Sequence, residues 1–131
     1  MQSADVVIIG GAAVGSATAA FLCRAGFKGR VVVVEKDPSY QWCATGRSVA
    51  SIRRQFSTRE NIELSTFGWQ YFSRIKEEYG PEAHVSLVER GYAIMASPEG
   101  AGVLRANIAL QQGLGADVEL LAPDALKARF S

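Results

Sequence analysis

The stretch "ADVVIIGGAAVGSATAAFL", residues 4–22, decides the fold of the N-terminal region. It contains four consecutive β-branched residues, Val6–Ile9, and such a run is typical of a parallel strand that is covered on both faces. Gly10 and Gly11 interrupt the run, and the residues after them are mostly small. We therefore expect a buried strand, a tight glycine turn and a helix over about residues 14–25.

A second β-branched run completes the unit. Gly26 ends the expected helix in the manner of a glycine cap, and Val31–Val34 form a second buried strand that leads into Glu35. The order strand, glycine turn, helix, strand is that of a βαβ unit, whose crossover is right-handed. The sequence therefore predicts an α/β fold that begins with a Rossmann-like unit.

The glycine turn has the residue types of a dinucleotide-binding loop, with one exception. In the pattern G-x-G-x-x-G, the first glycine permits the sharp turn, the second lets the pyrophosphate approach and the third packs helix against strand. Gly10 and Gly15 occupy the first and third positions, whereas Ala12 replaces the second. Ala13 and Val14 lie at the helix N-terminus, whose N–H groups bind phosphates. Because alanine adds only a methyl group, we expect a weakened pyrophosphate contact and not an abolished site.

Two charged residues come directly after the second strand. Glu35 lies 20 residues after Gly15, where a carboxylate accepts hydrogen bonds from ribose hydroxyls and repels a phosphorylated ribose, which argues against NADP. Lys36 is the next candidate for cofactor binding. A glycine fingerprint alone is a weak signal, and the alternative is a tight βα turn of another α/β protein with an incidental glutamate.

Composition disfavours several classes of partner. The 131 residues, 48% of them hydrophobic and 21% charged, suit one modest globular core. The net charge of +1 provides no footprint for nucleic acid or an anionic membrane. Cys23 and Cys43 form neither a disulfide framework nor a ligand pair, and His84 is the single histidine, so we expect no metal.

The uncharged stretch from Val6 to Cys23 has the length of a membrane or export signal. Half of it is Gly, Ala, Ser or Thr, and no Lys or Arg precedes it, which disfavours that alternative. We therefore expect a cytoplasmic protein that does not bind membranes.

The segment "YQWCATGRSVASIRRQFS", residues 40–57, extends the pattern beyond the βαβ unit. With "VVVVEKD" before it and a long helical stretch after it, it resembles the N-terminal region of the FAD-dependent D-amino-acid oxidase superfamily. The resemblance is to glycine-oxidase, sarcosine-oxidase and dimethylglycine-dehydrogenase-like members, and it extends to the closing "VELLAPDALKARF". It implies that FAD is the cofactor and that this loop passes the flavin.

The same segment supplies further site candidates. Thr45, Gly46, Arg47 and Ser48 offer hydroxyls, a guanidinium and backbone N–H groups, a second cradle for phosphate or ribose, although a solvated loop explains them equally. By resemblance, Arg53 lies beside the flavin as the catalytic-site candidate and binds a substrate carboxylate, for which its planar fork is suited. The alternative is a surface arginine paired with a nearby acid.

The remaining residues predict mixed secondary structure. A capping box of Ser57 and Glu60 opens a helix that ends at Gly80. Five apolar side chains repeat at helical spacing and so belong to one core-facing side: Ile62, Trp69, Phe72, Ile75 and Tyr79.

Beyond Gly80 we expect an antiparallel hairpin of residues 84–88 and 92–96. A helix then starts at Ser97 and Pro98, with Val103, Leu104 and Ile108 on its apolar side. A strand over 116–121 and a helix from Pro123 complete the chain.

The resemblance implies two domains, the N-terminal part of an FAD-binding domain over 1–80 and the beginning of an α+β substrate domain over 81–131, both incomplete. It implies an oxidoreductase that oxidises the C–N bond of an amino acid or N-methylated amine by hydride transfer to FAD. We expect this chain alone to be inactive and to associate with a C-terminal part or another subunit. Two alternatives stay open: a non-catalytic nucleotide-binding or interaction fragment, and an NAD-dependent dehydrogenase, which Glu35 supports but the "ATGRS" loop does not.

Overall fold

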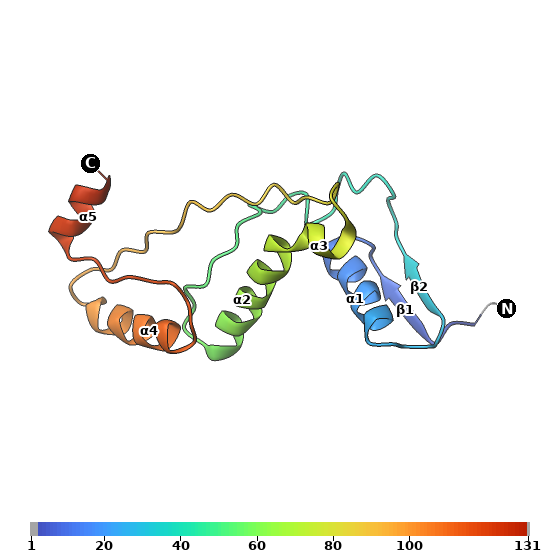
Figure 1. Cartoon of the computed structure of the whole chain (residues 1–131), viewed down its shortest axis with the longest axis horizontal. Helices are drawn as coiled ribbons and strands as arrows, with labels where there is room; N and C mark the ends of the chain where they lie inside the picture. Colours follow the sequence, from blue (N-terminus) through green and yellow to red (C-terminus); the bar gives the residue numbers. More distant parts are fainter. Residues whose placement is uncertain (1–2, 131) are drawn as a thin grey trace. The chain divides into compact units, whose positions relative to one another are not determined.

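The computed structural model describes residues 3–130 (Figure 1). They form two strands and five helices, in the order β1 (Val6–Ile9), α1 (Ala13–Arg24), β2 (Val31–Val34), α2 (Arg59–Ser73), α3 (Ile75–Tyr79), α4 (Ala101–Gly113) and α5 (Pro123–Phe130). The chain divides into two compact units, Met1–Ser51 and Ile52–Ser131. The predicted domain boundary after residue 80 stays a prediction.

The first unit is the predicted βαβ unit. β1 and β2 pair in parallel, with Val6 opposite Val31 and Ile9 opposite Val34. α1 packs against both strands, and the alternating burial of β1 places Val6 and Ile8 toward the helix. The other face is uncovered within this unit, since Val7 is 57% and Ile9 90% exposed. The expectation of strands covered on both faces is therefore wrong for the described residues, because α1 covers one face only.

Glycine ends α1 as predicted. Gly26 has a φ of +77° and its N–H donates to the Cys23 carbonyl at 3.0 Å. A left-handed residue just after the last turn satisfies carbonyls that the helix leaves free. The chain then passes through Phe27 and Gly29 into β2.

In the second unit, the predicted helix that ends at Gly80 is two helices. Arg74 separates α2 from α3 with φ −109° and ψ 18°, outside the helical range. The N-cap is Thr58, in extended conformation and without a side-chain capping bond, so the predicted Ser57 capping box is wrong by one residue. Ile62 is fully buried, but Tyr79, beyond the break, is 52% exposed.

The strands predicted for the second unit do not form. Among residues 3–130 the sheet has two strands, β1 and β2, and the ranges 84–88, 92–96 and 116–121 are irregular. Ser86 has a φ of +51°, a left-handed conformation that interrupts a regular strand. The described α/β structure is thus confined to the first unit, and the α+β substrate domain expected to begin over residues 81–131 stays a prediction.

Helix α4 also differs from its prediction. Its N-cap is Gly100, because residues 98–100 form a turn after Ser97. Leu104 and Ile108 are half-buried as expected, whereas Val103 is 66% exposed and does not belong to the apolar side.

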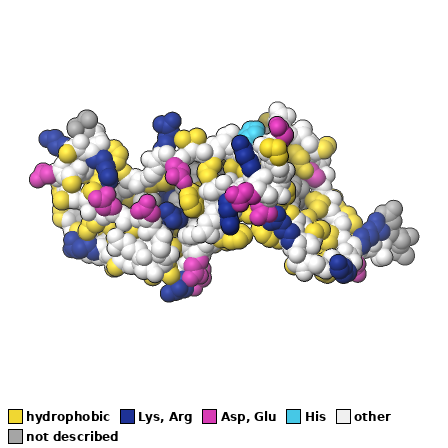
Figure 2. Space-filling model, in the orientation of Figure 1, with side chains coloured by type: hydrophobic (Ala, Val, Ile, Leu, Met, Phe, Trp, Pro, Cys, Tyr) yellow, Lys and Arg dark blue, Asp and Glu magenta, His cyan; other side chains and the backbone are white. Residues whose placement is uncertain are grey.

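The described core is small. Among the described residues Ile62 and Ala116 are the buried apolar side chains, and Gln111 is the buried polar one. Hydrophobic side chains are spread over the visible face in Figure 2. No helix among the described residues is long and apolar enough to cross a membrane.

Candidate functional site

Two glycines shape the turn between β1 and α1. Gly10 has a φ of +94°, which side chains rarely tolerate. A Cβ added to Gly15 would lie 1.8 Å from the Gly10 carbonyl oxygen, far inside van der Waals contact. The first and third positions of the fingerprint therefore require glycine for two different reasons, backbone conformation and close packing.

The middle position does not require glycine for its backbone. Ala12 is the N-cap of α1 with φ −70° and ψ −165°, an extended conformation open to any residue. No side chain caps the helix and its first turn contains no acid, so no carboxylate competes there for the free N–H groups. Ala13 and Val14 are exposed at the same end, with Val14 81% exposed. The helix terminus thus remains available to an anion.

Glu35 connects the end of β2 to the glycine turn. Its Oε2 accepts the Gly11 N–H at 2.7 Å, and its Oε1 accepts the Asp37 N–H at 2.9 Å. These bonds, from Asp37 first and Gly11 second, hold the pKa of Glu35 below its usual range. The side chain is therefore a fixed carboxylate at the carboxyl edge of the two strands.

The bound N–H groups leave Glu35 further capacity. A carboxylate oxygen has two acceptor positions, so each oxygen can also accept a hydroxyl. Lys36, the neighbouring candidate, is exposed. The carboxylate thus keeps free acceptor positions at the carboxyl edge of the two strands.

Tyr40 also lies close to the glycine turn, which the sequence analysis did not predict. It has a φ of +57°, which is rare for a bulky residue, and its ring reaches back to the glycine turn. A Cβ on Gly11 would lie 2.8 Å from the Tyr40 hydroxyl oxygen. The second of two consecutive glycines, which the fingerprint does not demand, was the available signal, because it indicates that something approaches the backbone closely.

The "ATGRS" loop is a compact turn. The N–H groups of Arg47 and Ser48 donate to Ala44 at 3.2 Å and Thr45 at 3.3 Å, and Gly46 N–H donates to the Cys43 Sγ at 3.3 Å. These backbone donors are thus engaged within the loop. The Arg47 guanidinium is the charged group of the loop that is left to contact a ligand.

All three arginines of the 40–57 segment lie over aromatic rings. Arg47 is 4.9 Å from the ring centroid of Trp42, Arg53 is 5.0 Å from that of Phe56, and Arg54 is 5.2 Å from that of Trp69. Within residues 3–130 none of the three forms an ion pair with an acid.

Arg53 is exposed, as the alternative interpretation expects, but among the described residues it does not have the acidic partner that this interpretation requires. An aromatic face orients a guanidinium without neutralising its charge. The charge of Arg53 is available to an anionic ligand.

The predicted site residues divide between the units. The first unit contains every cofactor candidate, namely Gly10, Ala12, Ala13, Val14, Gly15, Glu35, Lys36, Thr45, Gly46, Arg47 and Ser48. Arg53 belongs to the second unit. The structure brings Glu35 into contact with the glycine turn, and each of these roles in binding stays a prediction.

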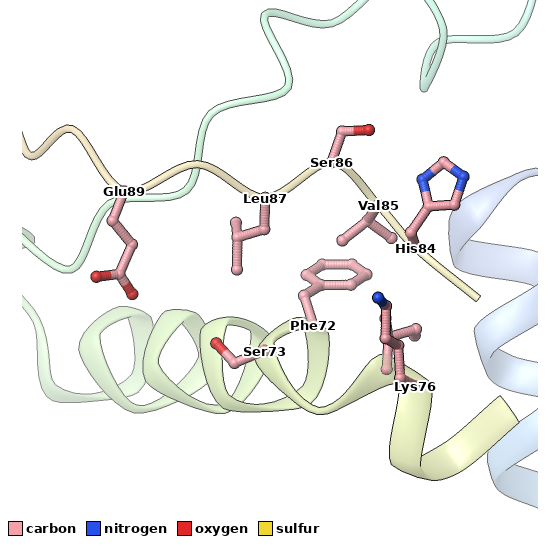
Figure 3. Close-up of a pocket in the computed structure, with 9 residues that line it drawn as sticks. Phe72, Ser73, Lys76, His84, Val85, Ser86, Leu87 and Glu89 are labelled. Atoms are coloured by element: carbon pink, nitrogen blue, oxygen red, sulfur yellow. The ribbon is translucent and has the colours of Figure 1, made fainter. Parts of the chain in front are cut away.

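The second unit also has a cleft that the sequence did not indicate. Its volume is about 460 Å³, and it lies between helices α2 and α3 and residues 84–89. Figure 3 shows Lys76 and His84 at one end, Glu89 at the other, and the ring of Phe72 between them. None of the predicted site residues lines it. Among residues 3–130 no cluster of His, Cys, Asp or Glu suits a metal ion.

Comparison with known proteins identifies the family. The model of the FAD dependent oxidoreductase (DAO) family matches residues 5–131. FAD-dependent oxidoreductase domain-containing protein 1 of Xenopus laevis is 39% identical over 136 residues, which cover 98% of this chain and 27% of that protein. The Drosophila melanogaster homolog of that name is 41% identical over 127 residues, covering 96% of this chain and 25% of its own.

The Bos taurus protein of the same name is 35% identical over 136 residues, covering 98% of this chain and 28% of its own. The chain thus spans about a quarter of the length of these curated relatives. No solved structure matches it. Because the family match extends over nearly all of its residues, this chain belongs to the FAD-dependent oxidoreductase (DAO) family, whose cofactor is FAD.

Proposed function

We propose that this chain contributes the adenosine-binding unit of an enzyme that oxidises the C–N bond of an amino acid or an N-methylated amine. The observation that carries the proposal is the hydrogen bond from Gly11 to Glu35, which joins the glycine turn to a carboxylate at the edge of the sheet. Dinucleotide sites of this fold place the pyrophosphate at the turn and the ribose at such a carboxylate.

The residues present fit FAD. Gly15 permits helix and strand to approach, the uncapped terminus of α1 supplies N–H groups for the pyrophosphate, and Glu35 supplies acceptors for ribose hydroxyls. Ala12 is compatible because its backbone is ordinary and its side chain is one methyl group. Bound there, FAD would supply the acceptor for a hydride from the carbon next to the substrate nitrogen, which would leave an imine that water hydrolyses.

We assign the substrate carboxylate to Arg53. Its guanidinium lies against the Phe56 ring and has no acidic partner among the described residues, so its charge is free to pair with an anion. A planar guanidinium binds both oxygens of a carboxylate, which orients an amino acid more strictly than a point charge does.

The test uses the complete protein, meaning the full product of the gene that encodes this chain. Purified protein is examined for flavin absorption, and hydrogen peroxide formation or dye reduction is measured with N-methyl glycines and D-amino acids. We expect a flavin spectrum and turnover of at least one of these amines. Arg53→Lys and Arg53→Met should raise KM for carboxylate substrates, while Arg54→Met provides the control. A flavoprotein without turnover of any such amine would contradict the proposal.

A further inference from the structure

A buried polar side chain lies on α4, in the second unit. Gln111, on α4, is 4% exposed, and its Nε2 donates to the Phe56 carbonyl at 2.8 Å, across 55 positions of sequence. A buried amide is costly unless it is hydrogen-bonded, so this bond specifies one position for the Phe56 backbone.

Further hydrogen bonds hold the rest of residues 53–56, which we call the arginine segment. The Ser65 hydroxyl, on α2, donates to the Arg53 carbonyl, and Gln55 Nε2 donates to the Tyr92 carbonyl at 3.0 Å. Within this segment the Cζ of Arg53 lies 5.0 Å from the centroid of the Phe56 ring. Helices α2 and α4 therefore fix the backbone of both Arg53 and Phe56, whose ring supports the guanidinium.

We infer that Gln111 is a positioning residue for Arg53. It does not touch the guanidinium but locates Phe56, and Phe56 orients the guanidinium. The inference rests on the proposed function only for the ligand, a carboxylate. Loss of the Gln111 bond leaves the Phe56 carbonyl without this donor and frees the arginine segment, so the guanidinium samples more orientations and pairs less well with both oxygens.

The experiment compares Gln111→Leu with Gln112→Leu in the complete, FAD-loaded protein. Gln112 is the control because its Nε2 also donates to a backbone carbonyl, that of Val118 at 3.0 Å, although its side chain is exposed and lies away from the arginine segment. Binding of acetate and of neutral acetamide is followed by perturbation of the flavin absorption. Hydrogen exchange of the peptide that covers residues 53–56 is measured in parallel, together with Tm and retained FAD.

We expect Gln111→Leu to weaken acetate binding by at least about fivefold, as if the guanidinium lost one of its two hydrogen bonds to the carboxylate, and to leave acetamide binding unchanged. Exchange over the arginine segment should be faster than in Gln112→Leu. A merely structural role would lower Tm and affect acetate and acetamide equally. Ser65→Ala should act in the same direction, with Ser73→Ala, whose hydroxyl bonds Trp69 within the same helix, as its control.

Arg53→Met separates the two hypotheses. If Arg53→Met loses acetate and Gln111→Leu behaves like Gln112→Leu, the inference is overturned and the proposed function stands. If Arg53→Met binds acetate normally, the proposed role of Arg53 fails, and hydrogen exchange then decides the inference. Faster exchange in Gln111→Leu supports the positioning role, and equal exchange in the two glutamine variants overturns it.

Discussion

Residues 6–35 and residues 84–96 both contain apolar runs typical of strands, and only the first region forms a sheet. In the first region β1 and β2 pair along four positions, and the Glu35 carboxylate ties their ends to the glycine turn. In the second, Ser86 and Gly91 have positive φ values and no ladder forms among the described residues. A strand pattern predicts extended backbone, but a sheet also needs a second strand to pair with. A specific contact, such as that between Glu35 and Gly11, therefore indicates a sheet better than apolar alternation does.

The largest expected effect breaks the first region at its closest contact. Gly15→Ala places a Cβ 1.8 Å from the Gly10 carbonyl oxygen and 2.9 Å from its carbon. We expect loss of FAD and destabilisation of about 3 kcal/mol or more, as for severe overpacking. Denaturant unfolding of the complete protein and its retained flavin provide the measurement.

Gly68→Ala is the control for that variant. Gly68 lies inside α2, and a Cβ there would meet no atom within 4 Å. Alanine should stabilise the helix by up to about 1 kcal/mol. Equal behaviour of the two variants would show that the Gly10–Gly15 contact does not determine the turn.

Ala12 allows a graded test of the same turn. Ala12→Gly should leave FAD affinity equal or higher, because it removes one methyl group from the pyrophosphate path. Ala12→Val should abolish measurable binding, because it places a branched side chain at the helix terminus where the phosphates approach. Titration of the apoprotein with FAD measures both. Full binding by the valine variant would mean that no pyrophosphate passes this turn.

Glu35→Ala removes the acceptor that connects strand and turn. We expect FAD affinity to fall roughly tenfold, as for a lost hydrogen bond to a charged group, with Lys36→Ala as the exposed neighbour for comparison. Titration calorimetry with FAD measures the change. An unchanged Kd would remove Glu35 from the site.

The same carboxylate predicts a pH dependence. The Asp37 and Gly11 N–H groups lower the folded-state pKa of Glu35 below its ordinary value of 4.5. Its contribution to stability is therefore complete above that value and is lost as pH falls from there through the folded-state pKa. In denaturant unfolding at pH 3 to 7, the free energy of unfolding should fall less steeply in acid for Glu35→Gln. The same pH dependence of the free energy of unfolding in Glu35→Gln and in the unaltered protein would contradict this contribution of Glu35.

The smallest effect is expected on α2, in the second unit. Arg59 and Glu63 form an ion pair at 2.9 Å on α2, with side chains 61% and 55% exposed. Because solvent screens such pairs, Glu63→Gln should change the free energy of unfolding by less than about 0.5 kcal/mol. A larger loss by chemical denaturation would show that this helix depends on surface charge.

Much of the first unit could be predicted because its determinants are close in sequence. Gly10, Gly15 and the run Val31–Val34 each impose a local conformation or a neighbour contact, and β2 begins and ends where the sequence predicted. Tyr40 was not predicted, because its approach to Gly11 depends on an unusual backbone angle that no residue type indicates.

The second unit was harder to predict because its contacts are distant in sequence. The bond between Gln111 and Phe56 spans two elements that no periodicity connects. The capping pattern placed the start of α2 one residue early, since Ser57 and Thr58 are both good caps and the backbone selects the second. The break between α2 and α3 at Arg74 contains neither proline nor glycine, so the sequence did not indicate it.

The parallel pairing of β1 with β2 also has a kinetic consequence. Val6 pairs with Val31 across 25 positions, and the 12 residues of α1 occupy about half of them. Closing a loop of that size costs on the order of 3 kcal/mol in chain entropy, and helix formation within it is fast. The pairing of β1 with β2 therefore needs no residue beyond Val34, whereas the arginine segment receives its bond from Gln111 only after residue 111 has been made.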